Sequence, residues 1–264
     1  MDKKMSHKRL LGIDLDGTLL DDHKLVSQEN LAGLKKAQKH DIIIAIATGR
    51  PVAAALDVIG EHDLDCYLIS HNGALIIDLS TGREVFMRAM DEEAAYEIIR
   101  FCIAQNEPLH IFGSEYWGVT GVNRYVDEFI ARHNLELNLI ENVSQLDGIP
   151  IINLTSVGNT HKVGSFIEKN GLDAYFIDSV PSIMDITHSK ATKGNALREL
   201  AVKLGVGAGR ILSIGNYYND VEMFAASAVG IAVQNSPEEV KRHADYVTNS
   251  SNNEHAVLEA LERF

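Results

Sequence analysis

The sequence predicts an α/β protein, a doubly wound parallel sheet of Rossmann-like type interrupted by an inserted α+β domain. Short apolar runs alternate with helical patterns over residues 9–70, the order that builds a parallel sheet. The same alternation returns after residue 193, and the order of strands and helices between the two stretches is mixed. This change of pattern predicts one domain formed by residues 1–80 and 189–264 and a second domain formed by residues 81–188.

In the first stretch, strands are predicted where branched aliphatic residues run together, and helices where a capping residue precedes apolar residues at helical spacing. Ser27 is the expected N-cap of the first helix, and Pro51 suits the first turn of the second. The strands are expected at 9–15, 42–47 and 67–70, and the helices at 27–40 and 51–59.

In the middle of the chain, Ser80-Thr81-Gly82 separates two strand-like runs, which is typical of a hairpin, and Asp91 is the expected cap of the helix that follows. The strands are expected at 74–78, 84–88, 109–112, 116–120, 151–156, 174–178 and 183–187. The helices are expected at 91–106, 122–133 and 161–168.

The last stretch returns to the α/β order. A helix is expected from Lys193 to about Leu204, and Pro237 opens another. The strands are expected at 211–214, 230–233 and 246–247, with a helix from about 219 and a terminal helix after the last strand.

The composition limits the partners of the protein. The formal net charge of the 264 residues is −13, and a strongly acidic protein repels nucleic acid and anionic lipid. The same charge repels a phosphorylated substrate, so a phosphate site needs local positive groups or a metal. Residues 1–9 are polar and charged, and no apolar stretch is long enough to span a membrane. We therefore expect a cytoplasmic protein that binds neither nucleic acid nor membrane; its oligomeric state is not readable from the sequence.

Two carboxylates, Asp14 and Asp16, stand at the carboxyl end of the first predicted strand, where open α/β sheets place their ligands. Side chains two residues apart on a strand share one face, and two carboxylates held that close repel each other unless a cation lies between them. Gly17 permits a tight turn, and Thr18 offers a hydroxyl and an N–H group. Taken alone, this segment could also be an ordinary strand-end turn.

Three further groups fall on the same edge of the predicted sheet. Thr48-Gly49-Arg50 ends the second strand and precedes a helix N-terminus, a place suited to anions. Lys193 opens a helix and could neutralise phosphate. The segment 215–220, Gly-Asn-Tyr-Tyr-Asn-Asp, follows a strand and carries oxygens that suit Mg²⁺. Together the four groups supply what phosphoryl transfer through an aspartyl-phosphate requires.

The ordered set Asp14-Leu15-Asp16-Gly17-Thr18, Thr48-Gly49-Arg50, Lys193 and 215–220 resembles the haloacid dehalogenase-like (HAD) superfamily of hydrolases. The segment Ser70-His71-Asn72-Gly73-Ala74 and the long insertion after it resemble the Cof-type subfamily IIB, in which an α+β cap of the C2 type is inserted into the core. The resemblance spans nearly the whole chain.

The resemblance implies roles for the matching positions. Asp14 would attack phosphorus, and Asp16 would protonate the leaving oxygen and later activate water. The implied phosphate ligands are Leu15, Thr48, Gly49, Lys193 and Asn219. The implied Mg²⁺ ligands are Asp14, Asp16, Asn216 and Asp220, and Arg50 and Asn72 are implied as substrate contacts.

One departure from the family pattern concerns Asn216, because relatives usually carry Asp there as a metal ligand. Asn still offers a carbonyl oxygen but removes one negative charge, so Mg²⁺ should bind more weakly unless Asp220 compensates. The main hypothesis is a Mg²⁺-dependent phosphatase acting on a small metabolite such as a sugar phosphate or a phosphorylated cofactor. The alternatives are a phosphotransferase or mutase and a catalytically weak binding or regulatory protein.

Overall fold

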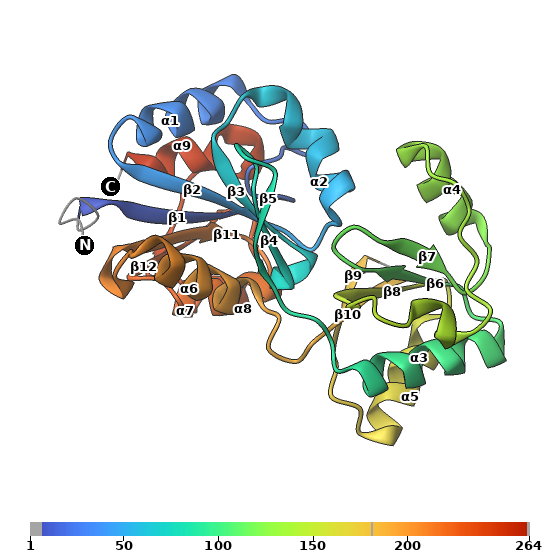
Figure 1. Ribbon diagram of the computed structural model, residues 1–264. Helices are drawn as coiled ribbons and strands as arrows, with labels where there is room; N and C mark the ends of the chain where they lie inside the picture. The colour runs from blue at the N-terminus through green and yellow to red at the C-terminus, as the bar shows by residue number, and fades with distance from the viewer. Residues whose placement is uncertain (1–6, 181, 263–264) are drawn as a thin grey trace. The chain divides into compact units, whose positions relative to one another are not determined.

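The computed structural model describes residues 7–180 and 182–262, and the chain divides into two compact units (Figure 1). Met1–Phe86 and Thr192–Phe264 form the first unit, and Met87–Ala191 form the second. The division therefore falls a few residues beyond the expected boundaries at 80 and 188. The reason at the first boundary is that the second strand of the predicted hairpin joins the sheet of the first unit.

The first unit contains an eight-stranded sheet in the order β13-β12-β11-β1-β2-β3-β4-β5. Neighbouring strands are parallel from β13 to β3, and β4 runs antiparallel to β3. The strands are β1 (Arg9–Asp14), β2 (Ile42–Ala47), β3 (Cys66–Ser70), β4 (Leu75–Asp78), β5 (Arg83–Met87), β11 (Ile211–Gly215), β12 (Val229–Ala232) and β13 (Tyr246–Val247). The predicted α/β class and doubly wound parallel sheet are confirmed.

Helices cover both faces of this sheet (Figure 1). Apolar side chains of α1, α2 and α9 share a core with one face, and those of α6 and α7 share a core with the other. Leu34 of α1 and Leu197 of α6 are fully buried, and burial of each leucine stabilises the fold by roughly 1.5–3 kcal/mol. The helices are α1 (Gln28–Gln38), α2 (Val52–Ile59), α6 (Lys193–Leu204), α7 (Val221–Ala225), α8 (Glu238–Lys241) and α9 (Ala256–Leu261).

The strand order fixes where a ligand site can lie. From β1 the chain proceeds to β2 and β3 on one side, whereas β11, β12 and β13 are added on the other side. Connections that diverge from neighbouring strands leave a crevice at the carboxyl ends, which is where doubly wound sheets bind their ligands. Asp14 ends β1 and Gly215 ends β11, so the loops after these two strands border the crevice.

The second unit contains an antiparallel sheet in the order β7-β6-β8-β10-β9. Helices α3 and α5 share a hydrophobic core with one face of the sheet. On α4, the ring of Phe129 lies 4.9 Å from that of His110 on β6. The elements are α3 (Glu92–Gln105), β6 (Leu109–Phe112), β7 (Trp117–Val119), α4 (Arg124–His133), β8 (Asn153–Val157), α5 (Thr160–Asn170), β9 (Tyr175–Val180) and β10 (Ile183–Thr187). Within residues 7–180 and 182–262, no helix has the length and apolar character needed to cross a membrane.

Candidate active site

A buried lysine joins two carboxylates at the carboxyl edge of the core sheet. The Nζ atom of Lys193 lies 2.6 Å from Oδ1 of Asp14 and 2.7 Å from Oδ1 of Asp220. All three residues are at most 5% exposed. Buried charges are tolerated when they are paired and hydrogen-bonded. We call these three residues the floor of the site.

The start of α6 explains how Lys193 reaches this position. The hydroxyl of Thr192 caps the helix by accepting a hydrogen bond from the N–H of Asn195 at 3.2 Å. A Cβ atom at Gly194 would lie only 2.2 Å from the carbonyl oxygen of Glu222. Glycine therefore allows the helix to approach the segment after β11, and this approach brings Lys193 within reach of both carboxylates.

The environment of the floor shifts the ionisation of its members. Burial, reinforced by the negative charge of Asp220, raises the pKa of Asp14 to about 7, although Lys193 opposes the rise. Burial alone would lower the pKa of Lys193, but the charges of Asp14 and Asp220 outweigh it and raise that pKa. Two carboxylates share one ammonium, so the floor carries one unbalanced negative charge when all three groups are ionised.

Asp220 also shapes the loop that follows β11. Its Oδ2 atom accepts hydrogen bonds from the N–H groups of Asn216 at 2.8 Å and Tyr217 at 3.0 Å. A Cβ atom at Gly215 would lie 2.5 Å from Cγ of Asp220. Because Lys193 takes Oδ1, both oxygens of Asp220 already have partners within the chain.

Two other buried oxygens fit a metal ion. Oδ2 of Asp14 and Oδ1 of Asn216 lack a hydrogen-bond partner among the described residues, and buried oxygens of this kind call for a partner. The amide of Asn216 lies against the turn after β1, since a Cβ atom at Gly17 would be 2.4 Å from its Nδ2. Carboxylate and amide oxygens are ligands that suit Mg²⁺.

Acidic side chains alone would not make this metal site. Over the described part of the chain, no group of three or more His, Cys, Asp or Glu residues could hold a metal ion. A metal ion at this edge would therefore need the amide oxygen of Asn216 or backbone oxygens in addition to Asp14.

The loops after β2 and β3 bring together four of the predicted residues. The hydroxyl of Thr48 accepts a hydrogen bond from the N–H of Arg50 at 3.1 Å, which leaves its own proton available to a ligand. Oδ1 of Asn72 accepts a hydrogen bond from Nδ2 of Asn219 at 3.0 Å. A Cβ atom at Gly49 would lie 3.0 Å from the Asn72 amide. The loops after β2, β3 and β11 thus meet at one place.

Asn72 reaches this position through an unusual backbone. Asn72 has a φ angle of 54° and its neighbour His71 has a φ angle of 49°. Left-handed conformations cost free energy for most residues, and they gather at functional sites. Asn tolerates the conformation better than most residues, which explains why it can occupy this turn.

Asp16 lies in a different environment, which we call the rim of the site and define by Asp16, Arg50 and Lys24. Arg50 donates from Nε to Oδ2 of Asp16 and from Nη2 to Oδ1, both at 2.7 Å. Nζ of Lys24 donates to Oδ1 at 2.8 Å. Burial alone would raise the pKa of Asp16, but the hydrogen bonds from Arg50 and Lys24 outweigh it and lower the pKa to about 2.

Lys24 and Leu15 both lie close to Asp16, Lys24 in space and Leu15 in the chain. Sequence reasoning missed Lys24; the only signal for it was a charged turn shortly after Asp16. Leu15 lies between the two carboxylates in the chain, and its side chain is fully buried. Only the backbone of Leu15 is therefore suited to contact a polar ligand.

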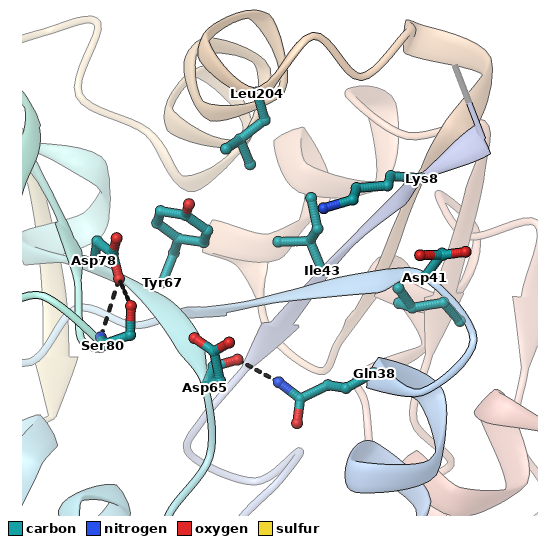
Figure 2. A pocket seen from close by; sticks show the side chains of 10 residues that line it. Lys8, Gln38, Asp41, Ile43, Asp65, Tyr67, Asp78, Ser80 and Leu204 are labelled. Atoms are coloured by element: carbon teal, nitrogen blue, oxygen red, sulfur yellow. Dashed lines mark hydrogen bonds between the residues drawn. The ribbon is translucent and has the colours of Figure 1, made fainter. Parts of the chain in front are cut away.

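A cavity lies away from these residues (Figure 2). It measures about 290 Å³ and is lined by residues at the amino ends of the strands, among them Lys8, Asp41 and Tyr67. At its edge, the Gln38 side chain donates to the carbonyl of Asp65. None of the predicted site residues lines this cavity, because they all lie at the carboxyl edge of the sheet.

Comparison with known proteins agrees with the fold. The sequence model of the haloacid dehalogenase-like hydrolase family matches residues 11–261, so the chain belongs to this family. It is 30% identical to the Bacillus subtilis protein YxeH over 267 residues, which cover 96% of this chain and 97% of YxeH. Phosphatase YwpJ of the same organism is 27% identical, with 96% of this chain and 98% of YwpJ covered. The protein is thus an enzyme of the phosphatase class.

Solved structures agree with this assignment. A haloacid dehalogenase-like hydrolase from B. subtilis has a TM-score of 0.82 at 25% identity, covering 97% of this chain and 99% of that chain. A subclass IIB sugar phosphatase has the same TM-score at 22% identity and the same coverage of both chains. At that identity the second match speaks for the fold alone. The predicted family is confirmed by the family model and by the likeness to YxeH, and the solved structures agree with the predicted fold.

Proposed function

We propose that this enzyme is a Mg²⁺-dependent phosphatase that hydrolyses a small phosphate monoester through an aspartyl-phosphate on Asp14. The observation that carries the proposal is the floor, where Lys193 bridges Asp14 and Asp220 while Oδ2 of Asp14 lacks a partner within residues 7–180 and 182–262. A buried carboxylate at the ligand-binding edge of the sheet can hold a metal ion with one oxygen and attack phosphorus with the other.

In the first step, a bond forms between a carboxylate oxygen of Asp14 and phosphorus as the bond from phosphorus to the ester oxygen breaks. The leaving oxygen takes a proton from Asp16. In the second step, water adds to phosphorus, the bond to Asp14 breaks, and Asp16 takes the proton of the water. Inorganic phosphate leaves, and Asp14 returns to its starting form.

The phosphoryl oxygens would be held by positive and hydrogen-bonding groups around the floor. These are the ammonium of Lys193 and donors of Leu15, Thr48, Gly49 and Asn219. Donors that are fixed before the reaction stabilise charge that develops in the transition state. The hydrogen bond from Asn219 to Asn72 and the one accepted by Thr48 fix part of this set in advance.

The rim sets the state of Asp16. Its low pKa keeps the carboxylate ionised, which suits the second step, where Asp16 accepts a proton. To protonate the leaving oxygen in the first step, Asp16 must first carry a proton. This requires the hydrogen bonds from Arg50 and Lys24 to Asp16 to weaken when the ester binds. Arg50, whose guanidinium grips Asp16 with two donors, would act as a positioning residue.

Mg²⁺ would be held by Oδ2 of Asp14, the backbone carbonyl of Asp16 and Oδ1 of Asn216. When bound, it would supply positive charge that offsets the phosphoryl group and the surplus negative charge of the floor. Asp220 was also expected to be a ligand, but its two oxygens are engaged by Lys193 and by backbone N–H groups. We therefore assign Asp220 to the orientation of Lys193 and of the loop that carries Asn216.

Relatives bear on the substrate class. One relative, 28% identical, is named 5-amino-6-(5-phospho-D-ribitylamino)uracil phosphatase in B. subtilis. Another, 27% identical, is named phosphoglycolate phosphatase in Methanosarcina acetivorans. Their leaving groups differ widely, while both names describe hydrolysis of a small phosphate ester. This supports a small phosphorylated metabolite, a sugar phosphate or a phosphorylated cofactor, as the substrate.

The test is hydrolysis of p-nitrophenyl phosphate with Mg²⁺ and after its removal by chelation. We expect the wild type to be active only with Mg²⁺, and Asp14→Asn to lose at least about 1000-fold in kcat, because it removes the nucleophile. A wild type as slow as Asp14→Asn would overturn the proposal.

The substitution of Asn for Asp at position 216 favours one second candidate, a binding protein with weak catalysis. Asn216→Asp separates the two functions. If the wild type is inactive and Asn216→Asp gains strong Mg²⁺-dependent hydrolysis, the binding function is favoured. If the wild type turns over and Asn216→Asp mainly lowers the Mg²⁺ requirement, the phosphatase is supported.

A further inference from the structure

The loop between β1 and α1 is held in one conformation by two aspartates. Oδ1 of Asp21 accepts hydrogen bonds from the N–H groups two and four residues later, both at 2.9 Å. The carboxylate of Asp22 accepts hydrogen bonds from the side chains of Asn252 and Asn253 at 3.1 and 3.0 Å. The N–H of Asp22 donates to Oδ1 of Asn253 at 3.0 Å. The loop is thus tied both to itself and to a segment far away in the sequence.

This arrangement fixes the direction of Lys24. Its φ angle is 64°, a left-handed conformation that is uncommon for residues other than glycine. Such backbone strain persists only where the surrounding structure imposes it, and it gathers at functional sites. In this conformation the ammonium of Lys24 lies 2.8 Å from Oδ1 of Asp16.

The two cations of the rim differ in how many of their hydrogen-bond donors are already used. Arg50 donates hydrogen bonds from Nε and Nη2 to Asp16, and from Nη1 to the carbonyl of Ala54 at 3.1 Å. Its charge also lies in the field of Asp14 and Asp57. Toward the described part of the chain, Lys24 uses one donor, on Asp16, and its side chain is 56% exposed. An ammonium has three donors, so Lys24 keeps capacity for a ligand where Arg50 is committed to the protein.

We propose that Lys24 binds an anionic group, a carboxylate or a second phosphate, on the leaving group of the substrate. This rests on the proposed phosphatase function, in which Asp16 contacts the leaving oxygen. Lys24 lies 2.8 Å from Oδ1 of Asp16, so an ester oxygen hydrogen-bonded to either oxygen of that carboxylate would lie within roughly 8 Å of the ammonium. An anion two to five bonds beyond the ester oxygen can span this distance.

The net charge of the whole protein means that a substrate with a second anion needs a local positive group at the site. The net charge of −13 repels a substrate that carries a further anion besides its phosphate. The floor is itself negative when ionised, so it offers nothing to that second anion. Lys24 provides a local positive group on the half-exposed side of Asp16, where a leaving group can reach it.

The test uses two pairs of esters that differ in the second anion. The first pair is 2-phosphoglycolate and 2-hydroxyethyl phosphate, and the second is 1,3-propanediol bisphosphate and 3-hydroxypropyl phosphate. For at least one pair, we expect the wild type to favour the anionic member at least tenfold in kcat/KM. Lys24→Met should reduce that ratio about tenfold, and Lys24→Arg should keep most of it, because the charge is retained.

The ratio is the decisive readout, because a purely structural role of Lys24 would slow both members of a pair equally. Lys36→Met removes the same charge at an exposed position of α1 in the same unit. It should leave both ratios as in the wild type. Ratios in Lys24→Met equal to those in the wild type, or no preference for either anionic ester, would overturn the inference. An absence of hydrolysis of every ester by the wild type would instead contradict the proposed function.

Discussion

The floor and the rim of the site hold two carboxylates that stand two residues apart in the chain yet lie in opposite environments. Asp14 is 5% exposed and shares one ammonium with a second carboxylate. Asp16 has a side chain that is 37% exposed, and two cations contact it. Burial and a like charge raise the pKa of Asp14 to about 7, whereas hydrogen bonds from cations lower that of Asp16 to about 2 despite its partial burial.

One strand end can thus supply two chemical roles. The floor has one surplus negative charge and the rim one surplus positive charge when all groups are ionised. A metal cation is therefore attracted to the floor, and an anion is attracted to the rim. Pairs of carboxylates whose environments separate their pKa values commonly divide the work of a nucleophile and an acid or base.

The largest effect is expected from Lys193→Met, which leaves two buried carboxylates without their cation. Removal of one partner from a buried ion pair costs about 3–5 kcal/mol, and we expect the free energy of unfolding to fall by that amount. The same change should raise KM and lower kcat, because the charge acts on both bound substrate and transition state. Urea unfolding without metal and steady-state kinetics measure the two effects.

The double variant Asp14→Asn with Lys193→Met tests whether the charge is responsible. It leaves one buried carboxylate in place of two, so its loss of stability should be smaller than the sum of the two single losses. Strict additivity would contradict the electrostatic account of the floor.

Asn216→Asp should come next, because it adds a negative charge at a proposed ligand of Mg²⁺. We expect the Mg²⁺ concentration for half-maximal activity to fall about tenfold, equivalent to about 1.4 kcal/mol. Asn170→Asp adds the same charge on a helix of the second unit and serves as the control. An unchanged Mg²⁺ requirement in Asn216→Asp would mean that residue 216 does not face the metal.

The smallest effect is expected at the rim and concerns pH. The pKa of Asp16 is lower in the folded protein than its usual value of 3.8, so the folded state binds fewer protons than the unfolded state in this range. Asp16 therefore stabilises the fold above about pH 4, and this contribution is lost as the pH falls from about 4 through 2. Because the side chain is more than a third exposed, solvent screening limits the contribution to about 1 kcal/mol or less.

The measurement for the rim is urea unfolding of the wild type and of Asp16→Asn at pH 7 and pH 3. The wild type should lose more stability than the variant between these two pH values, and the difference isolates Asp16. An equal loss in both proteins would contradict the ion pairs of Asp16 with Arg50 and Lys24.

The sequence by itself determined the α/β class, the parallel core sheet and the edge at which the site lies. These follow from local signals: apolar runs form the strands, and Asp14, Thr48 and Asn216 each stand where such a run ends or just beyond it. Parallel strands bring their carboxyl ends to one edge, so residues distant in the chain could be placed together without coordinates. The family assignment rested on the same spacing.

Only the tertiary structure decided which charges meet. Lys193 reaches Asp14 across 179 residues, and both oxygens of Asp220 are occupied, which no local pattern revealed. Lys24 is directed toward Asp16 by a loop that is tied to Asn252 and Asn253, about 230 residues away. Contacts of this kind depend on packing between distant elements, so local periodicity and capping patterns do not encode them.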